Sequence, residues 1–158
     1  MTGFLASLLT DYEAQIERHR NRPFLKASMA ACALAAVADG SPTFSERIRV
    51  DQILETLEAL KVFDPHVGVE LFNEFSQGIL KAPRDGRAKA LAAVQAVAKN
   101  SDTAGLIVRI CLAVAESKGE KTLVDQIEIV MLCSMLGVEP KDAGLYTDGS
   151  PEDLLGKA

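Results

Sequence analysis

The sequence predicts an all-α protein: a compact bundle of about seven to eight helices in a single domain over residues 1–145, with a loosely held tail at 146–158. Prolines and glycines divide the 158 residues into pieces of helical length. Within most pieces, apolar residues recur at spacings of three and four, the period of an amphipathic helix. Aromatic residues make up only 5% of the chain and tryptophan is absent, so residue types that strands favour are scarce.

The first two predicted helices differ in character. Residues 3–20 carry apolar residues at 5, 8, 9, 12 and 16 and end in a basic cluster, which indicates an amphipathic helix. We expect Pro23 to restart the chain, because proline favours the first turn of a helix. Residues 23–39 are almost wholly small and apolar, as expected of a helix buried on most sides. Gly40 suits the left-handed residue that follows a helix end.

Start and stop signals predict five more helices. Ser45 is the expected cap of the first, Asp64 followed by Pro65 marks the start of the second, and Gly137 stops the last. The residues at 122–125 resemble a capping box. In the first of these helices the inner stripe is expected to consist of Ile48, Ile53, Leu57 and Leu60. The predicted ranges are 45–61, 65–80, 83–99, 101–117 and 122–136, followed by a short turn at 140–145.

Two parts of the chain resemble each other. The segment MAACALAAVADG, which begins at residue 29, aligns with VRICLAVAESKG, which begins at residue 108, and this pairs Cys32 with Cys111. Each copy continues through a polar loop to an acidic residue, Glu46 or Asp125, and into an apolar helix. Two related helical hairpins predict a bundle with a pseudo-twofold internal repeat.

Charge and cysteine usage narrow the classes of function. The chain has 22 acidic and 17 basic residues, and the resulting net charge of -5 disfavours nucleic acid as a partner. The three cysteines lie in apolar runs without a Cys-x-x-Cys spacing, which is typical of reduced thiols in an intracellular protein. The first ten residues are too short for a signal peptide, and the apolar run at 27–38 is too short to cross a bilayer. We therefore expect a cytoplasmic protein.

The sequence contains little that indicates catalysis. His19 and His66 are isolated, and no phosphate-binding glycine loop or nucleophile elbow is present. Cys32 and Cys111 raise the alternative of thiol chemistry, but their apolar surroundings favour inert core packing. We predict no catalytic residues, no small-molecule substrate and no enzymatic activity.

One pair of carboxylates points to a metal site. Asp39 follows a long apolar helix, where the negative end of the helix dipole disfavours a carboxylate, and Glu46 begins the next helix. Two carboxylates with nearby carbonyl groups form a hard oxygen site suited to calcium or magnesium. The alternative is that Asp39 only solvates a helix end and Glu46 only favours a helix start. On these residues alone the alternative carries slightly more weight.

The second copy of the turn is a poorer ligand set. Lys118 stands where Asp39 stands in the first copy, and an ammonium group cannot bind a metal. Glu116, Glu120 and Asp125 keep the neighbourhood acidic, so a salt bridge is an alternative to an ion there. Glu116 and Asp125 complete the predicted metal ligands, together with Asp39 and Glu46.

The first helix also has two interpretations. Its apolar face, Phe4, Leu5, Leu8 and Leu9, lies in sequence before basic residues at 18, 20, 22 and 26, a combination suited to an anionic membrane or a protein partner. Core packing is the favoured interpretation, because a small bundle needs its terminal helix to cover the centre.

An ordered set of segments in this chain resembles the TerB family of tellurite-resistance proteins. The segments are RHRNRPF, CALAAVADG with Glu46, LKVFD, AVAESKG and LGVEPKDAGL, and the resemblance covers about residues 11–145. The resemblance implies a non-enzymatic helical bundle with pseudo-twofold symmetry that binds divalent cations after its two hairpin turns. Carried over by position, the first site falls on Asp39 and Glu46. Lys118 and Asp125 depart from the family's Asp and Glu, which argues against a second metal.

These observations lead to two hypotheses of function. The first is a cytoplasmic accessory protein of tellurite or general stress resistance, a helical adaptor that binds calcium or magnesium. The second is a metal-independent scaffold for protein interactions. The resemblance implies protein partners from the tellurite-resistance system, with peripheral attachment at the inner face of the membrane.

Overall fold

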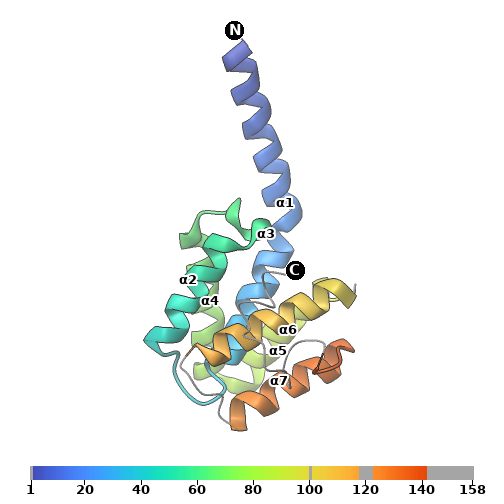
Figure 1. Ribbon diagram of the computed structural model, residues 1–158. Coiled ribbons are helices and arrows are strands. Elements are labelled where there is room, and N and C mark those ends of the chain that lie inside the picture. The colour runs from blue at the N-terminus through green and yellow to red at the C-terminus, as the bar shows by residue number, and fades with distance from the viewer. Residues whose placement is uncertain (1, 100, 118–122, 142–158) are drawn as a thin grey trace.

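The protein is built from helices alone wherever the chain is described. The computed structural model describes residues 2–99, 101–117 and 123–141, apart from the side chains at 2, 11, 15–20, 123 and 125. Within these ranges no strand is present, and the all-α prediction is confirmed (Figure 1). The predicted tail at 146–158 lies outside them. The helices are α1 (Thr2–Ala36), α2 (Phe44–Thr56), α3 (Glu58–Lys61), α4 (Pro65–Lys81), α5 (Pro83–Val97), α6 (Ser101–Glu116) and α7 (Leu123–Leu136).

The core is organised around the second half of α1. From Leu25 to Val37 nearly every residue is buried, and α4, α5 and α6 pack around this segment. Its many alanines allow neighbouring helix backbones to approach closely, which is why a run of small residues can occupy the centre. The segment includes Leu25, Ala27, Ser28, Met29, Ala30, Ala31, Cys32, Ala33, Leu34, Ala35 and Ala36, each at most 1% exposed.

The predicted break at Pro23 is wrong, because residues 2–36 form one continuous helix of 35 residues. An internal proline removes one helical hydrogen bond and crowds the carbonyl four residues earlier, at a cost of about 3 kcal/mol. Pro23 is exposed and lies just before the buried segment, which begins at Leu25. Burial of that segment holds the backbone helical on the far side of the proline and offsets the cost.

The first half of α1 projects away from the body of the protein (Figure 1). The expectation that its apolar face packs on the core is therefore wrong. Phe4, Leu5, Leu8, Leu9 and Tyr12 are between 55% and 71% exposed. The physical reason is the continuity at Pro23: without a break the helix cannot fold back over the bundle. Among the described residues, no helix is long and apolar enough to cross a membrane.

The helix predicted at 45–61 begins earlier and is interrupted. Thr43, not Ser45, is the cap: its hydroxyl accepts from the Glu46 N–H at 3.1 Å, and the Glu46 carboxylate accepts from the Thr43 N–H at 2.8 Å. Leu57 adopts an extended conformation and separates α2 from α3. Of the predicted inner stripe, Ile53 and Leu60 are buried, Leu57 is half-buried and Ile48 is 40% exposed.

Several other predicted boundaries agree with the structure. Asp64 caps α4 by accepting from the His66 N–H at 2.9 Å, with Pro65 in the first turn. Gly137 has a φ of 70° and follows the last residue of α7. The predicted start of that helix at 122 and most of the turn at 140–145 lie outside the described residues. The pseudo-twofold repeat stays a prediction, although the Cys111 thiol donates to the Ala31 carbonyl at 3.3 Å and so joins the two aligned segments.

The hairpin of α4 and α5 depends on one glycine. A Cβ atom at Gly86 would lie 2.6 Å from the Ile79 Cα and closer still to the backbone carbonyl of Gly78. Only glycine, which has no Cβ atom, fits there without moving the two helix backbones apart.

Gly86→Ala should lower the free energy of unfolding by about 1–3 kcal/mol, because overpacking forces a backbone shift. Gly78→Ala is the matched control on the facing helix, since a Cβ there meets nothing within 4 Å. It should raise the free energy of unfolding by up to about 1 kcal/mol through helix propensity. Urea titrations followed by circular dichroism measure both values, and an equal effect of the two substitutions would contradict the close approach at Gly86.

Candidate functional site

The first acidic turn connects α1 to α2. We define it as residues 37–46. Helix α1 ends at Ala36. The chain then turns, with the Gly40 N–H donating to the Val37 carbonyl at 3.3 Å and with a φ of 136° at Gly40. Asp39 lies on the exposed part of this turn. Its predicted position beside the carboxyl end of α1 agrees with the structure, so its carboxylate stands where the helix dipole is negative.

Glu46 lies at the far end of the same turn and is completely buried. Its Oε1 atom accepts from the Thr43 N–H, so one carboxylate oxygen serves as half of a capping box. The sequence interpretation missed this role, although the signal was present: threonine followed three residues later by glutamate is the capping-box pattern.

The second acidic turn, which we define as residues 116–125, is described only in part. Glu116 is the last residue of α6 and is half-buried. Lys118, Glu120 and the side chain of Asp125 lie outside the described residues. Within the described part of the chain, no three His, Cys, Asp or Glu side chains are grouped closely enough to hold a metal ion. The structure therefore does not bring Asp39, Glu46 and Glu116 together as one ligand set, and the predicted set of four stays a prediction.

A groove lies at the foot of the projecting helix. We call it the basal groove. Its volume is about 780 Å³, and sequence reasoning did not predict it because three helices contribute to it. The residues on α5 include three alanines, whose small side chains leave the space open. The lining consists of Arg22, Pro23 and Lys26 from α1, Leu71, Glu74 and Phe75 from α4, and Lys89, Ala92, Ala93 and Ala96 from α5.

A second feature that the sequence did not reveal is an ion pair between α5 and α7. Arg87 Nη1 donates to Glu128 Oε1 at 2.8 Å, and Glu128 is only 7% exposed. A buried carboxylate requires such a partner, since removal of the arginine would leave an uncompensated charge. A small cavity of about 110 Å³ beside the pair is lined mainly by Leu91, Met131, Leu132 and Met135.

The three thiols are buried, and their surroundings favour the protonated form. Burial raises the pKa of Cys32 to about 12 and the pKa of Cys133 to about 11, against an ordinary value of 9.0. Burial also raises the pKa of Cys111 well above that value, and the nearby charges of Cys32 and Glu128 raise it further. Since the thiolate is the nucleophilic form, these environments favour the core-packing interpretation over thiol chemistry.

The fold and these sites define a class: a helical bundle whose described residues hold acidic turns and open surfaces but no cluster of catalytic groups. Comparison with known proteins identifies the family. The family model described as "Tellurite resistance protein TerB" matches residues 25–146, and the chain belongs to the TerB family.

A relative from Alcaligenes sp., named "Tellurium resistance protein TerB", is 27% identical over 108 residues, which cover 68% of this chain and 88% of the relative. No solved structure gives a significant match. The family match begins at Leu25, the residue at which α1 becomes buried, so the projecting half of α1 lies outside it.

Native protein should react slowly with a thiol reagent at pH 8, whereas protein unfolded in urea should react at once at all three cysteines. The raised pKa values also make the folded state bind protons more tightly than the unfolded state. Stability contributed by the thiols should therefore be full below pH 9 and decrease as the pH rises toward 11. Absorbance of the released reagent measures the labelling, and fast native labelling of Cys32 or Cys111 would contradict the assignment.

Proposed function

We propose that this protein is a non-enzymatic accessory protein of tellurite or general stress resistance, which acts in the cytoplasm by binding a divalent cation and protein partners. The observation that carries the proposal is the TerB family match over residues 25–146. The similar protein from Alcaligenes sp. is named for tellurium resistance, which supports the same role.

The chemistry of the described side chains supports binding rather than catalysis. His66 is exposed and its Nε2 atom lies 3.0 Å from the Glu70 carboxylate, on the outside of α4 rather than in a cavity. The thiols are buried with raised pKa values. A hydrolytic or transfer enzyme needs a nucleophile beside a base in a concave site. None of the described cavities combines these groups.

The proposed cation site is the first acidic turn. Asp39 supplies an exposed carboxylate and Glu46 a buried one, and both are hard oxygen donors of the kind that calcium and magnesium prefer. Because Glu46 already caps α2 through one oxygen, most of the coordination would come from backbone carbonyls and water. This donor set fits a hydrated divalent cation bound weakly. Glu116 and Asp125 are proposed to add charge from the second turn.

An exposed apolar face on α7 supports the adaptor role. Val124, Ile127, Met131 and Met135 lie at helical spacing and are between 37% and 54% exposed. Such a face is a common feature of protein interaction sites, and methionine adapts to different partners. We place these partners within the tellurite-resistance system, at the inner face of the membrane.

The family role can be tested by complementation. The host is a bacterium that has lost its tellurite resistance because its own TerB was deleted. Expression of this chain in that host should restore growth on tellurite. Loss of complementation by a variant with charged residues on the α7 face, such as Met131→Glu, would support the adaptor role. If the unmodified chain fails to restore growth although it is expressed and folded, the role in tellurite resistance is contradicted.

The cation site makes a separate prediction. Calcium or magnesium should raise the melting temperature of metal-stripped protein, with a stabilisation of about 2.7 kcal/mol at a hundredfold excess over Kd. Asp39→Asn should abolish that gain, because it removes the exposed carboxylate that the proposed site provides.

Asp51→Asn is the matched control, because it removes the same charge from an exposed position on α2. This variant should keep the full gain from the cation. Differential scanning calorimetry with and without cation measures all three proteins. Equal gains in the wild type and in Asp39→Asn, or no gain in either, would favour the metal-independent scaffold.

A further inference from the structure

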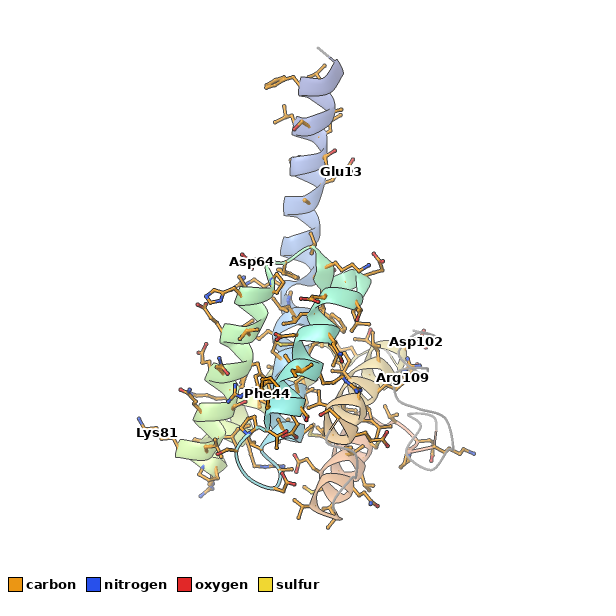
Figure 2. The ribbon with its side chains drawn as sticks, turned by 60° about the vertical axis from the view of Figure 1, so that its left-hand side comes forward. Glu13, Phe44, Asp64, Lys81, Asp102 and Arg109 are labelled. Atoms are coloured by element: carbon orange, nitrogen blue, oxygen red, sulfur yellow. The ribbon has the colours of Figure 1, made fainter. Side chains whose placement is uncertain are left out.

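The projecting half of α1 presents an apolar face with no cover from the described part of the chain. Phe4, Leu5, Leu8, Leu9 and Tyr12 follow one another at helical spacing on one face of the helix. Figure 2 shows Glu13 on the same isolated stretch, far from the other helices. A helix of this length is only marginally stable alone in water, and an apolar face of this size is costly to hydrate. The face therefore favours an occupant that the described residues of its own bundle do not supply.

The charges of the outer part of this stretch, residues 2–17, select against a membrane. Residues 2–17 contain Asp11, Glu13 and Glu17 and neither lysine nor arginine. An anionic lipid surface attracts basic amphipathic helices and repels acidic ones. The chemistry that fits is an apolar surface with a positively charged rim.

The basal groove has that chemistry. Its floor is formed by apolar side chains of α4 and α5, including Leu71, Phe75 and Ala93. Around them lie three cationic side chains, Arg22, Lys26 and Lys89, and one acidic side chain, Glu74. A volume of about 780 Å³ is in the range of cavities that enclose sizeable apolar groups. The same molecule thus carries both an acidic apolar helix and a basic apolar groove.

The two features cannot meet within one chain. The projecting stretch and the foot of the groove belong to the same uninterrupted helix, which continues past Pro23 without a turn. The helix therefore leads away from its own groove. Figure 1 shows its first half projecting from the body of the protein.

We propose that two copies of this chain form a twofold dimer in which their α1 helices pair antiparallel, so that the projecting half of each lies in the basal groove of the other. With Leu8 of one copy at the level of Pro23 of the other, the twofold axis passes between Gln15 and Ile16. Residues 8 and 23 of one chain are about 22 Å apart along the helix at 1.5 Å per residue, so the two symmetry-related contacts between Leu8 and Pro23 are separated by that distance.

In this register the charges are complementary. Residues 11 and 13, both acidic, lie at the level of residues 20 and 18 of the second copy, both arginine. Phe4 and Leu5 reach the level of residues 26–27, within the groove, so both apolar faces and both grooves are covered at once. A twofold arrangement is closed, which prevents further growth into filaments.

The mass of the full chain in solution tests the dimer. Light scattering after size exclusion should give about twice 16.9 kDa at micromolar concentrations. Leu8→Glu should weaken association at least tenfold while the helical circular dichroism stays unchanged, because Leu8 is exposed in the single chain. A wild-type protein that is monomeric up to 100 µM would overturn the proposal, as would a dimer that Leu8→Glu leaves intact.

The groove is tested with a matched pair of exposed positions on α5. Ala96 lines the basal groove and Gln95 does not. Ala96→Glu should weaken the dimer at least tenfold, whereas Gln95→Glu, which adds the same charge one residue away, should leave the mass unchanged. Equal behaviour of the two variants would show that the groove is not the occupied surface.

Disulfide formation tests the antiparallel arrangement. Gln15→Cys lies beside the proposed axis and should cross-link two chains under mild oxidation, while the native thiols are buried. Leu8→Cys should not cross-link, because its two copies are about 22 Å apart along the helix. Cross-linking of both variants would indicate a parallel pair. Binding of wild-type monomer to anionic vesicles, abolished by Leu8→Glu, would identify a membrane as the occupant instead.

Discussion

Burial of the alanine-rich half of α1 is the constraint on which the rest of the structure depends. A helix buried on all sides satisfies its backbone hydrogen bonds internally, so it can occupy the centre of the bundle without polar partners. Its small side chains then require other helices to approach closely. The Cys111 thiol contacts the Ala31 carbonyl from α6, and Gly86 allows α5 to lie against α4 beside it. Substitution of larger residues in α1 would displace several helices together.

The same burial determines what the ends of α1 can do. Because the helix continues without a break through Pro23, the projecting half has no route back to the bundle. At the other end, the chain leaves the core at Val37 and must start α2 within a few residues, which the capping box of Thr43 and Glu46 accomplishes. Both the basal groove and the first acidic turn are thus consequences of one packed helix.

Most local signals were predictable from the sequence, apart from the capping box of Thr43 and Glu46, and long-range effects were not. Asp64 with Pro65 and Gly137 mark helix boundaries through their own backbone preferences, and the structure agrees. Pro23 was misjudged because packing of later residues overrides its local cost, and the interruption at Leu57 had no local marker. At the candidate site, the predicted end of the apolar helix just before Gly40 was enough to place Asp39 beside the carboxyl end of that helix. The groove and the Arg87–Glu128 pair each require helices far apart in sequence.

Two of the proposed binding surfaces, the first acidic turn and the dimer surface, involve different parts of α1. The first acidic turn begins at Val37, and Lys26 is the residue of α1 in the basal groove that lies nearest to it, so about 16 Å of helix separates the turn from the proposed dimer surface at 1.5 Å per residue. Two sites at this separation that share no partner residues contribute independently to the free energy of binding. Coupling would need two discrete arrangements of the buried segment, and close packing against α4, α5 and α6 opposes a second one. Occupation of the turn by a cation should therefore leave the association of the α1 helices unchanged.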